Sequence, residues 1–421
     1  MDRSFGQVPA TDRLAAGSSL SANSSPFPLG NLSGTRQLSN VPDDVGYQLY
    51  ESDDQTDATL PFGPLEPLHR LWDRTNGHLR RSISLDLGLN YTAAYQRADS
   101  AIQGPKDASD GDLDFFGRWH LTGYEDEWPG SLVFSAENRH RLSKIPPADL
   151  NTGAVGGIIV GFGVQDFSLV QCYWEQGSFE DRLILRVGRM DPALIYDGGR
   201  YVSSNYAFFS PAFSDTLPMA VPDAGLGIAA GLYPTESSYI AGGFHDANGR
   251  RTTAGWNTFF EDAEFYSAIE LGWFPNEGQP NEASYHFTLW HIDARRDAKR
   301  PSDHGLALTL ERETGCRGRY VPFVRYAYAK RGLNDVRQNL SIGIGIEEVF
   351  DKNFDLIGTA FSWQDPSTAG LGDQYVFETF YRFVVTPHTH VTPDLQVIVD
   401  PAREPSRNAV TVFGLRVRTL Y

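Results

Sequence analysis

The chain has 421 residues and a formal net charge of −17 at pH 7, from 36 basic and 53 acidic side chains. A general nucleic-acid binder needs a basic surface, so this charge argues against one. The mean hydropathy is −0.35 and no run of about 18 apolar residues occurs, which excludes a transmembrane helix but not a transmembrane β-barrel. The chain holds 41 Gly, 26 Phe, 19 Tyr and 8 Trp, a composition that favours strands and turns over helices.

Residues 1–60 are rich in Ser, Asn, Gly, Pro, Asp and Thr, and we expect a polar leader that is disordered or loosely attached. No apolar segment follows Met1, so we expect no signal peptide in the chain. Residues 61–79 are expected to contain a short helix that ends at Gly77. Its apolar residues recur at helical spacing: Leu65, Leu68, Leu71 and Trp72.

From residue 80 onward, apolar residues alternate with polar or small ones. Leu85, Leu87 and Leu89 show the pattern clearly, with one polar or small residue between each pair. The pattern recurs in about sixteen segments of roughly ten residues, longer than the five or six usual in soluble proteins. We expect strands near residues 81–95, 112–122, 131–139, 165–176, 182–189, 225–232, 238–245, 264–274, 284–292, 304–312, 319–329, 338–349, 354–363, 374–385, 389–399 and 409–421.

The connections between these segments alternate between short turns and long loops, which is typical of an up-and-down barrel with two unlike rims. We therefore predict an all-β fold, in which residues 80–421 form a transmembrane antiparallel up-and-down β-barrel of about 16 strands. An even number of strands places both ends of the barrel at the short-turn rim, where the helix in 61–79 would be periplasmic. A soluble β-sandwich is the alternative, but its strands are shorter, and Arg on the polar faces suits a water-filled lumen.

The C-terminal residues 370–421 contain an E-x-x-Y-R strand, a Thr-Pro turn, a Pro-Asp-x-Gln strand, an Asp-Pro corner and a terminal Gly-x-Arg strand. The residues are Glu378, Tyr381, Arg382, Thr386, Pro387, Pro393, Asp394, Gln396, Asp400, Pro401, Gly414 and Arg416. With these motifs and RLILRVGRMDP at 182–192, the chain resembles the carbohydrate-selective porins of the OprB family, more loosely over residues 80–421. One departure is Tyr421, where the family usually ends in Phe. The resemblance implies passive diffusion of sugars or similar small polar solutes across a Gram-negative outer membrane, without catalysis.

The resemblance also implies that the third long loop folds into the barrel and narrows the channel. Its Arg, Asp and aromatic side chains are suited to bind sugar hydroxyls or stack on a pyranose face, unless they only fix the loop to the wall. Candidates for the constriction and for solute contact are Arg186, Arg189, Asp191, Asp197, Arg200, Tyr201 and Tyr206. Candidates for lining the pore, with structural Arg–Glu pairing as the alternative, are Arg118, Glu137, Arg139, Glu347, Glu378, Arg382 and Arg416.

The other motifs are weak. The glycine-rich stretch 153–163 lacks the flanking strand and helix of a dinucleotide loop, and His388 with His390 lacks a third metal ligand. We therefore expect no metal and no cofactor. Cys172 and Cys316 fit unrelated thiols better than a disulfide, although their pairing stays open.

Two alternatives to a sugar channel remain. One is a general or cation-preferring porin, and the other, from a different class, is a secreted all-β glycan-binding protein or glycosidase. For the barrel, the expected partners are outer-membrane lipid, lipopolysaccharide and small polar solutes, with no nucleic acid. The oligomeric state, monomer or homotrimer, is left open.

Overall fold

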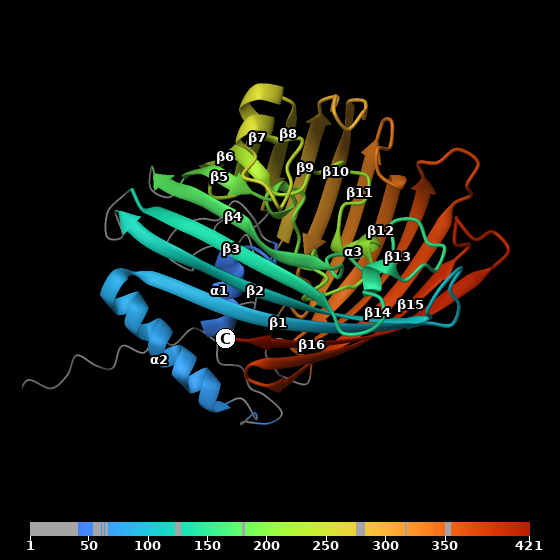
Figure 1. Ribbon diagram of the computed structural model, residues 1–421, viewed down its shortest axis with the longest axis horizontal. Coiled ribbons are helices and arrows are strands. Elements are labelled where there is room, and N and C mark those ends of the chain that lie inside the picture. The colour runs from blue at the N-terminus through green and yellow to red at the C-terminus, as the bar shows by residue number, and fades with distance from the viewer. Residues whose placement is uncertain are drawn as a thin grey trace, which may run out of the picture.

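Antiparallel strands β1 to β16 close into a single barrel in the computed structural model (Figure 1). The structure describes residues 41–53, 60, 63, 66–122, 128–178, 182–274, 283–315, 318–349 and 355–421. The strands are β1 (Leu85–Ala98), β2 (Asp107–Thr122), β3 (Gly130–Arg141), β4 (Gln165–Ser178), β5 (Leu183–Met190), β6 (Gly225–Thr235), β7 (Ser238–Asp246), β8 (Phe265–Trp273), β9 (Ala283–Ile292), β10 (Asp303–Arg312), β11 (Tyr320–Ala329), β12 (Val336–Glu347), β13 (Leu356–Pro366), β14 (Gln374–Thr386), β15 (Thr389–Val399) and β16 (Ala409–Leu420). The predicted barrel and its strand order are confirmed.

Each strand pairs with its neighbours in the chain, and the barrel closes where β1 pairs with β16. The register at this closure runs from Asn90 opposite Leu420 to Ala98 opposite Val412. Closure leaves the sheet with no free edge, so the strands satisfy their backbone hydrogen bonds without water. No helix among the described residues is long and apolar enough to cross a membrane.

Apolar side chains of the strands face the outside of the barrel, and polar or small side chains face its lumen. On β16, Phe413, Leu415 and Val417 point outward and are exposed, and Phe413 keeps 57% of its surface accessible. The residues between them point into the barrel, where Arg416 is 1% exposed. An apolar outer face needs lipid to cover it, whereas a soluble sandwich would bury that face in a core. The alternation therefore distinguishes a membrane barrel from the soluble sandwich.

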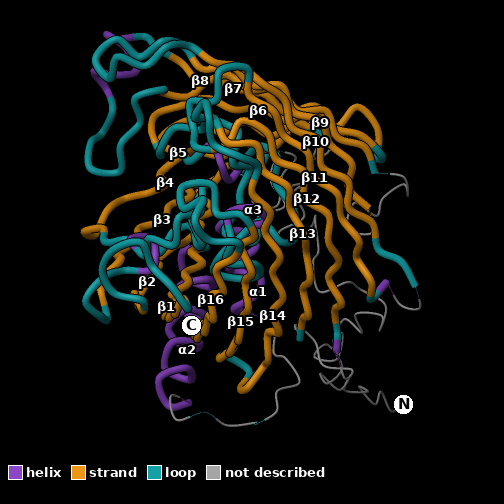
Figure 2. The backbone as a smooth tube through the Cα atoms, turned by 90° about the vertical axis from the view of Figure 1, so that its right-hand side faces the viewer, coloured by secondary structure: helices purple, strands orange, loops and turns teal. Residues whose placement is uncertain are grey.

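The connections form two unlike rims, as the gap lengths predicted. Figure 2 shows long teal loops gathered at one end of the barrel. They include residues 142–164, 191–224 and 247–264, whereas the connection between β14 and β15 consists of Pro387 and His388 alone. We call these ends the long-loop rim and the short-turn rim.

The helix α2 (Glu66–Ile83) is longer than the sequence predicted, because it runs through Gly77. A glycine inside a helix costs only about 1 kcal/mol relative to alanine, and tertiary contacts offset that cost here. The side chain of Asn76 accepts from the backbone N–H of Leu87 at 2.9 Å and donates to its carbonyl at 2.8 Å. The expected start of the first strand at residue 81 is therefore wrong, and β1 begins at Leu85 after the turn at Ser84.

The end of the predicted leader is ordered. Val41 to Gln48 and the helix α1 (Val45–Asp53) enter the barrel, and Asp44 and Val45 are fully buried. For these residues the expectation of a loosely attached leader is wrong, because they pack against the inner wall. Residues 1–40 and 54–59 of that leader lie outside the described residues.

Candidate functional site

The third long connection, residues 191–224, lies inside the barrel, and we call it the inward loop. It contains a short 3-10 turn, η2 (Pro192–Leu194), and one helical turn, α3 (Pro211–Ser214). The Asp191 carboxylate accepts from the N–H of Ala193 at 3.0 Å and caps η2. Helix α3 is held on the wall by Ser341, whose hydroxyl donates to the Ala212 carbonyl at 2.8 Å. The fold expected for this loop is thus observed.

Asp197 lies near the start of the inward loop and anchors it to β10 and β11 of the wall. Its carboxylate lies 3.0 Å from Nη2 of Arg325 on β11 and accepts from Thr309 Oγ1 on β10 at 2.8 Å. Burial alone would raise the pKa of Asp197, but Arg325 and His286 hold this pKa at about 2. The ionised carboxylate is therefore a structural anchor, surrounded by protein and not by the channel.

Arg200 and Tyr201 form the second anchor. The Arg200 guanidinium lies 3.2 Å from Glu347 on β12 and 2.6 Å from Glu313, and it is 4% exposed at its side chain. The Tyr201 hydroxyl donates to the same Glu347 carboxylate at 3.0 Å. These side chains are satisfied by one another, so they fix the loop to the wall.

The third anchor joins the middle of the inward loop, residues 206–210, to β14 and β16. Glu378 accepts from the backbone N–H of Ser210 at 2.9 Å. Arg382 lies over the Tyr206 ring at 3.6 Å and donates to its hydroxyl at 2.7 Å. Arg416 donates to the Ala207 carbonyl at 3.0 Å. Three predicted pore-lining residues are thus engaged in holding the loop.

The remaining arginines also contact protein groups. Arg186 and Arg118 share the carboxylate of Glu175, at 2.8 and 3.2 Å. Arg189 donates to the carbonyls of Leu169, Arg250 and Thr253, each at 2.7 Å, and so ties the 247–264 loop to the wall.

The segment 41–48 is a second occupant of the lumen, and it was missed from the sequence. Asp44 pairs with Arg186 at 3.3 Å, and Asp43 accepts from the hydroxyl of Ser203 in the inward loop at 2.9 Å. Tyr47 meets Tyr206 edge to face at 5.6 Å. The available signal was a polar turn before apolar residues, in VPDDVGYQL at 41–49, which the polar composition of the surrounding leader obscured.

An open cavity of about 120 Å³ remains between α1, the inward loop and strands β2 to β4. Of the predicted site residues, only Glu137, Arg139 and Asp191 line it. The full lining is Asp43, Gln48, Asp114, Phe116, Ser135, Glu137, Arg139, Val170, Gln171, Asp191, Leu194, Asn205 and Arg251. We call this cavity the eyelet.

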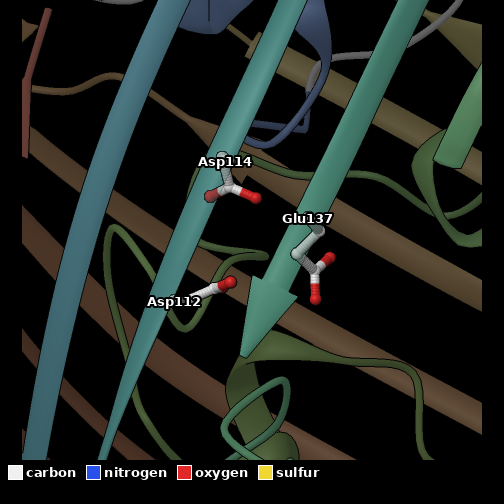
Figure 3. A group of neighbouring side chains, drawn as sticks. All are labelled: Asp112, Asp114 and Glu137. Atoms are coloured by element: carbon white, nitrogen blue, oxygen red, sulfur yellow. The ribbon is translucent and has the colours of Figure 1, made fainter. Parts of the chain in front are cut away.

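Carboxylates outnumber guanidinium groups around the eyelet. Figure 3 shows Asp112 and Asp114 of β2 beside Glu137 of β3. One carboxylate oxygen from each of the three residues lies within 4.8 Å of the others. Arg251 pairs with Glu137 at 2.9 Å, and Arg139 contacts both Glu137 and Asp112. The three carboxylates have the donor chemistry for a cation, but these arginines already neutralise part of their charge.

Two further carboxylates, Asp43 and Asp191, border the eyelet outside the strands. Burial raises the pKa of both, and Arg418 opposes this for Asp43 while Arg251 opposes it for Asp191. The polar side chains of Gln48, Gln171 and Asn205 complete the lining. The eyelet thus offers both hydrogen-bond donors and acceptors around a small cavity.

An inside-out antiparallel barrel with a loop folded into its lumen defines an outer-membrane porin. A family model described as "Carbohydrate-selective porin, OprB family" matches residues 133–320 and 298–421, and the chain belongs to this family. The structure resembles the high-pH structure of Pseudomonas putida OprB with a TM-score of 0.67 and 14% identity, over 83% of this chain and 97% of that one. This similarity supports the fold.

Two curated porins are also similar in sequence. Porin AaxA of Chlamydia abortus is 25% identical over 310 residues, which cover 71% of this chain and 67% of that protein. Porin AaxA of Chlamydia felis is 24% identical over 310 residues, which cover 71% of this chain and 68% of that protein. These relatives agree with the family in indicating a channel.

Proposed function

We propose that the porin admits carbohydrates or similar small polar solutes by passive diffusion through the eyelet. The observation that carries this proposal is the mixed lining of the opening, where amide, hydroxyl, carboxylate and guanidinium groups surround about 120 Å³ of free volume. Sugar hydroxyls both donate and accept hydrogen bonds, so such a lining can replace their hydration. Family membership points to the same solutes.

Liposome swelling tests this proposal. Full-length protein is reconstituted into liposomes, and the swelling rate is measured with a mono-, a di- and a trisaccharide. We expect rates well above those of protein-free liposomes and a steep fall with sugar size, because the eyelet is narrow. Rates equal to those of protein-free liposomes for every sugar would contradict the proposal.

A cation-preferring porin is the second candidate, and the excess of carboxylates favours it. Asp43, Asp114, Glu137 and Asp191 line the eyelet together with Arg139 and Arg251. A negative potential at a constriction enriches cations and repels anions. The reversal potential in a potassium chloride gradient measures this preference, and a value near zero would reject it. Sugar passage and cation preference are compatible properties of one eyelet.

The solute-contact roles assigned from the sequence change accordingly. We propose Glu137, Arg139 and Asp191 as solute contacts, and Asp197, Arg200, Tyr201 and Tyr206 as loop anchors. The absence of catalysis, the surrounding lipid, and the choice between monomer and homotrimer stay predictions.

A further inference from the structure

A groove runs along the outer face of β6 to β9, just below the long-loop rim. Its free volume is about 610 Å³, and its lining is almost entirely apolar. Small outward residues, Ala230, Gly242 and Ser267, form the floor. Larger outward residues stand around them: Ile228, Phe244, Ile269, Leu289 and His291. A shape of this kind, within the lipid-facing belt, fits a hydrocarbon chain.

Exposed aromatic rings lie at the rim next to this groove. Trp256 and Phe260, in the 247–264 loop, are 60% and 65% exposed and stack with ring centroids 5.9 Å apart. Phe259 contacts Phe265, the first residue of β8, at 5.3 Å and so holds this turn over the outer wall. Figure 1 shows the turn as the yellow coil above β7 and β8. Exposed Trp and Phe in this position are typical of residues that sit among lipid headgroups.

The neighbouring loop, 293–302, is basic although the protein is acidic overall. Its sequence DARRDAKRPS carries Arg295, Arg296, Lys299 and Arg300. Backbone hydrogen bonds between Arg295 and Arg300, at 2.9 and 3.1 Å, fold it into a hairpin above β9 and β10. The basic side chains are thus presented at the same rim as the stacked aromatics.

Carboxylates near this loop pair with other side chains, so Lys299 and Arg300 remain available to bind an anion. Glu264 pairs with Arg296 at 2.7 Å, and Asp293 pairs with His291 at 3.1 Å. Lys299 and Arg300 are exposed and make no ion pair within the part of the chain that the structure describes. They are therefore available to an anion that approaches from the outer leaflet.

We propose that this surface binds lipopolysaccharide, with an acyl chain in the groove of β6 to β9 and a phosphate of its headgroup at Lys299 and Arg300. The proposal rests on the porin lying in the outer membrane with its long-loop rim outward. Charge complementarity selects this occupant, because lipopolysaccharide carries both acyl chains and several phosphates. A second copy of the chain docked by the same face would instead bring two basic loops together.

The test uses full-length porin in detergent, titrated with rough lipopolysaccharide and, separately, with phosphatidylglycerol. The double variant Lys299→Glu/Arg300→Glu removes the phosphate contacts, and Ala230→Phe fills the groove. The matched control, Lys144→Glu/Arg407→Glu, makes the same charge change on long-loop residues at the opposite side of the barrel. The mobility of unboiled protein in SDS checks that every variant folds.

We expect the Lys299 and Arg300 variant to weaken lipopolysaccharide binding about thirtyfold, since each basic residue near an anionic surface contributes about 1 kcal/mol. Ala230→Phe should also weaken binding, and the control should not. The proposal would be overturned if phosphatidylglycerol bound as tightly as lipopolysaccharide. It would also be overturned if the control variant lost as much lipopolysaccharide affinity as Lys299→Glu/Arg300→Glu. Loss of oligomers with Ala230→Phe, at unchanged lipopolysaccharide affinity, would show instead that the groove is an interface between copies.

Swelling rates of the same variants separate this inference from the proposed function. Sugar passage should be unchanged in all of them, because the surface lies outside the lumen. Failure of lipopolysaccharide binding with normal sugar passage would overturn the lipid site alone.

Discussion

Asp44 of the N-terminal segment and Arg186 of β5 lie 3.3 Å apart inside the barrel, and their side chains are 0% and 1% exposed. The pair joins a segment that precedes the barrel to the wall that carries the inward loop. Because a nine-residue helix is marginal by itself, the position of α1 depends on contacts of this kind. The lumen is therefore narrowed by two segments. They are α1, which precedes β1 in the chain, and the inward loop, which follows β5.

Asp44→Ala/Tyr47→Ala should release α1 from the lumen and raise the single-channel conductance. Removing one partner of a buried ion pair costs on the order of 3–5 kcal/mol, and Tyr47 supplies the adjoining aromatic contact. Conductance in a planar bilayer measures the effect. Glu66→Ala, which removes an exposed pair with Arg70 in α2, is the control and should leave the conductance unchanged. A double variant with the conductance of the parent protein would show that α1 does not restrict the channel.

Asp114→Asn/Glu137→Gln should lower the preference for cations. The change removes two carboxylates from the eyelet while Arg139 and Arg251 remain, so the local charge becomes more positive. The reversal potential in a salt gradient should shift toward anion passage. Asp166→Asn, on an exposed residue at the long-loop rim, is the control. An unchanged reversal potential would mean that Asp114 and Glu137 do not determine the ion selectivity of the channel.

The anchor at Asp197 should keep the inward loop in place in acid. The pKa of this carboxyl is about 2 in the folded state, below its reference value of 3.8. The ionised Asp197 side chain therefore stabilises the folded state above pH 3.8. That contribution, roughly 2 kcal/mol, is lost only as the pH falls through about 2. Hydrogen exchange of the inward loop should therefore show no loss of protection between pH 7 and pH 4, after correction for the intrinsic pH dependence.

Asp197→Asn tests the same anchor through stability. The variant should melt at a lower temperature than the parent at pH 7, and the difference should shrink as the pH approaches 2. Scanning calorimetry at several pH values measures both effects. Equal melting temperatures at pH 7 would mean that the pair with Arg325 contributes nothing.

The docking of α2 should weaken in mild acid. His69 stacks between His388 and Tyr421, with ring centroids at 3.9 and 4.4 Å. Burial and the neighbouring His388 lower the pKa of His69 to about 4, from 6.5. Protonation therefore favours the undocked state, and the stability of the docked helix falls as the pH drops from about 6.5 toward 4.

Hydrogen exchange of residues 66–83 measures this docking. We expect faster exchange at pH 5 than at pH 7 after correction for the intrinsic pH dependence. His69→Phe keeps an aromatic ring without the charge, and it should reduce the difference. If the corrected rates are the same at both pH values in the parent protein, the histidine stack does not hold α2.

The strands could be predicted closely because period-2 alternation reports directly on a wall with lipid on one side and water on the other. The predicted segment 389–399 matches β15 in full, and most others differ by a few residues at their ends. Gly77 shows where local signals fail, since the contacts of Asn76 and His69 continue the helix beyond it. Tyr421, which stands where the family usually has Phe, stacks on His69 of α2 with ring centroids 4.4 Å apart.

The site was harder to predict because an inward residue has two possible partners, solute or protein. Arg200 and Glu347 were both expected near the channel, and the structure pairs them with each other. Nothing in the sequence shows which inward Arg meets an inward Glu, since the pairing depends on the path of the inward loop. Arg251 and Gln48 were missed for the same reason, because they belong to segments that reach the lumen from outside the strands.

Cys172 is a free thiol, and Cys316 lies outside the described residues.

Cysteine accessibility tests the position of the eyelet most directly. In a background with Cys172→Ser and Cys316→Ser, Ser135→Cys places a thiol on the eyelet and Ser362→Cys places one on the inner wall behind the inward loop. A charged methanethiosulfonate reagent is added while conductance and sugar passage are recorded. We predict a fall in both with Ser135→Cys and no change with Ser362→Cys. The reverse result, or no change with either, would contradict a channel that passes between α1, the inward loop and strands β2 to β4.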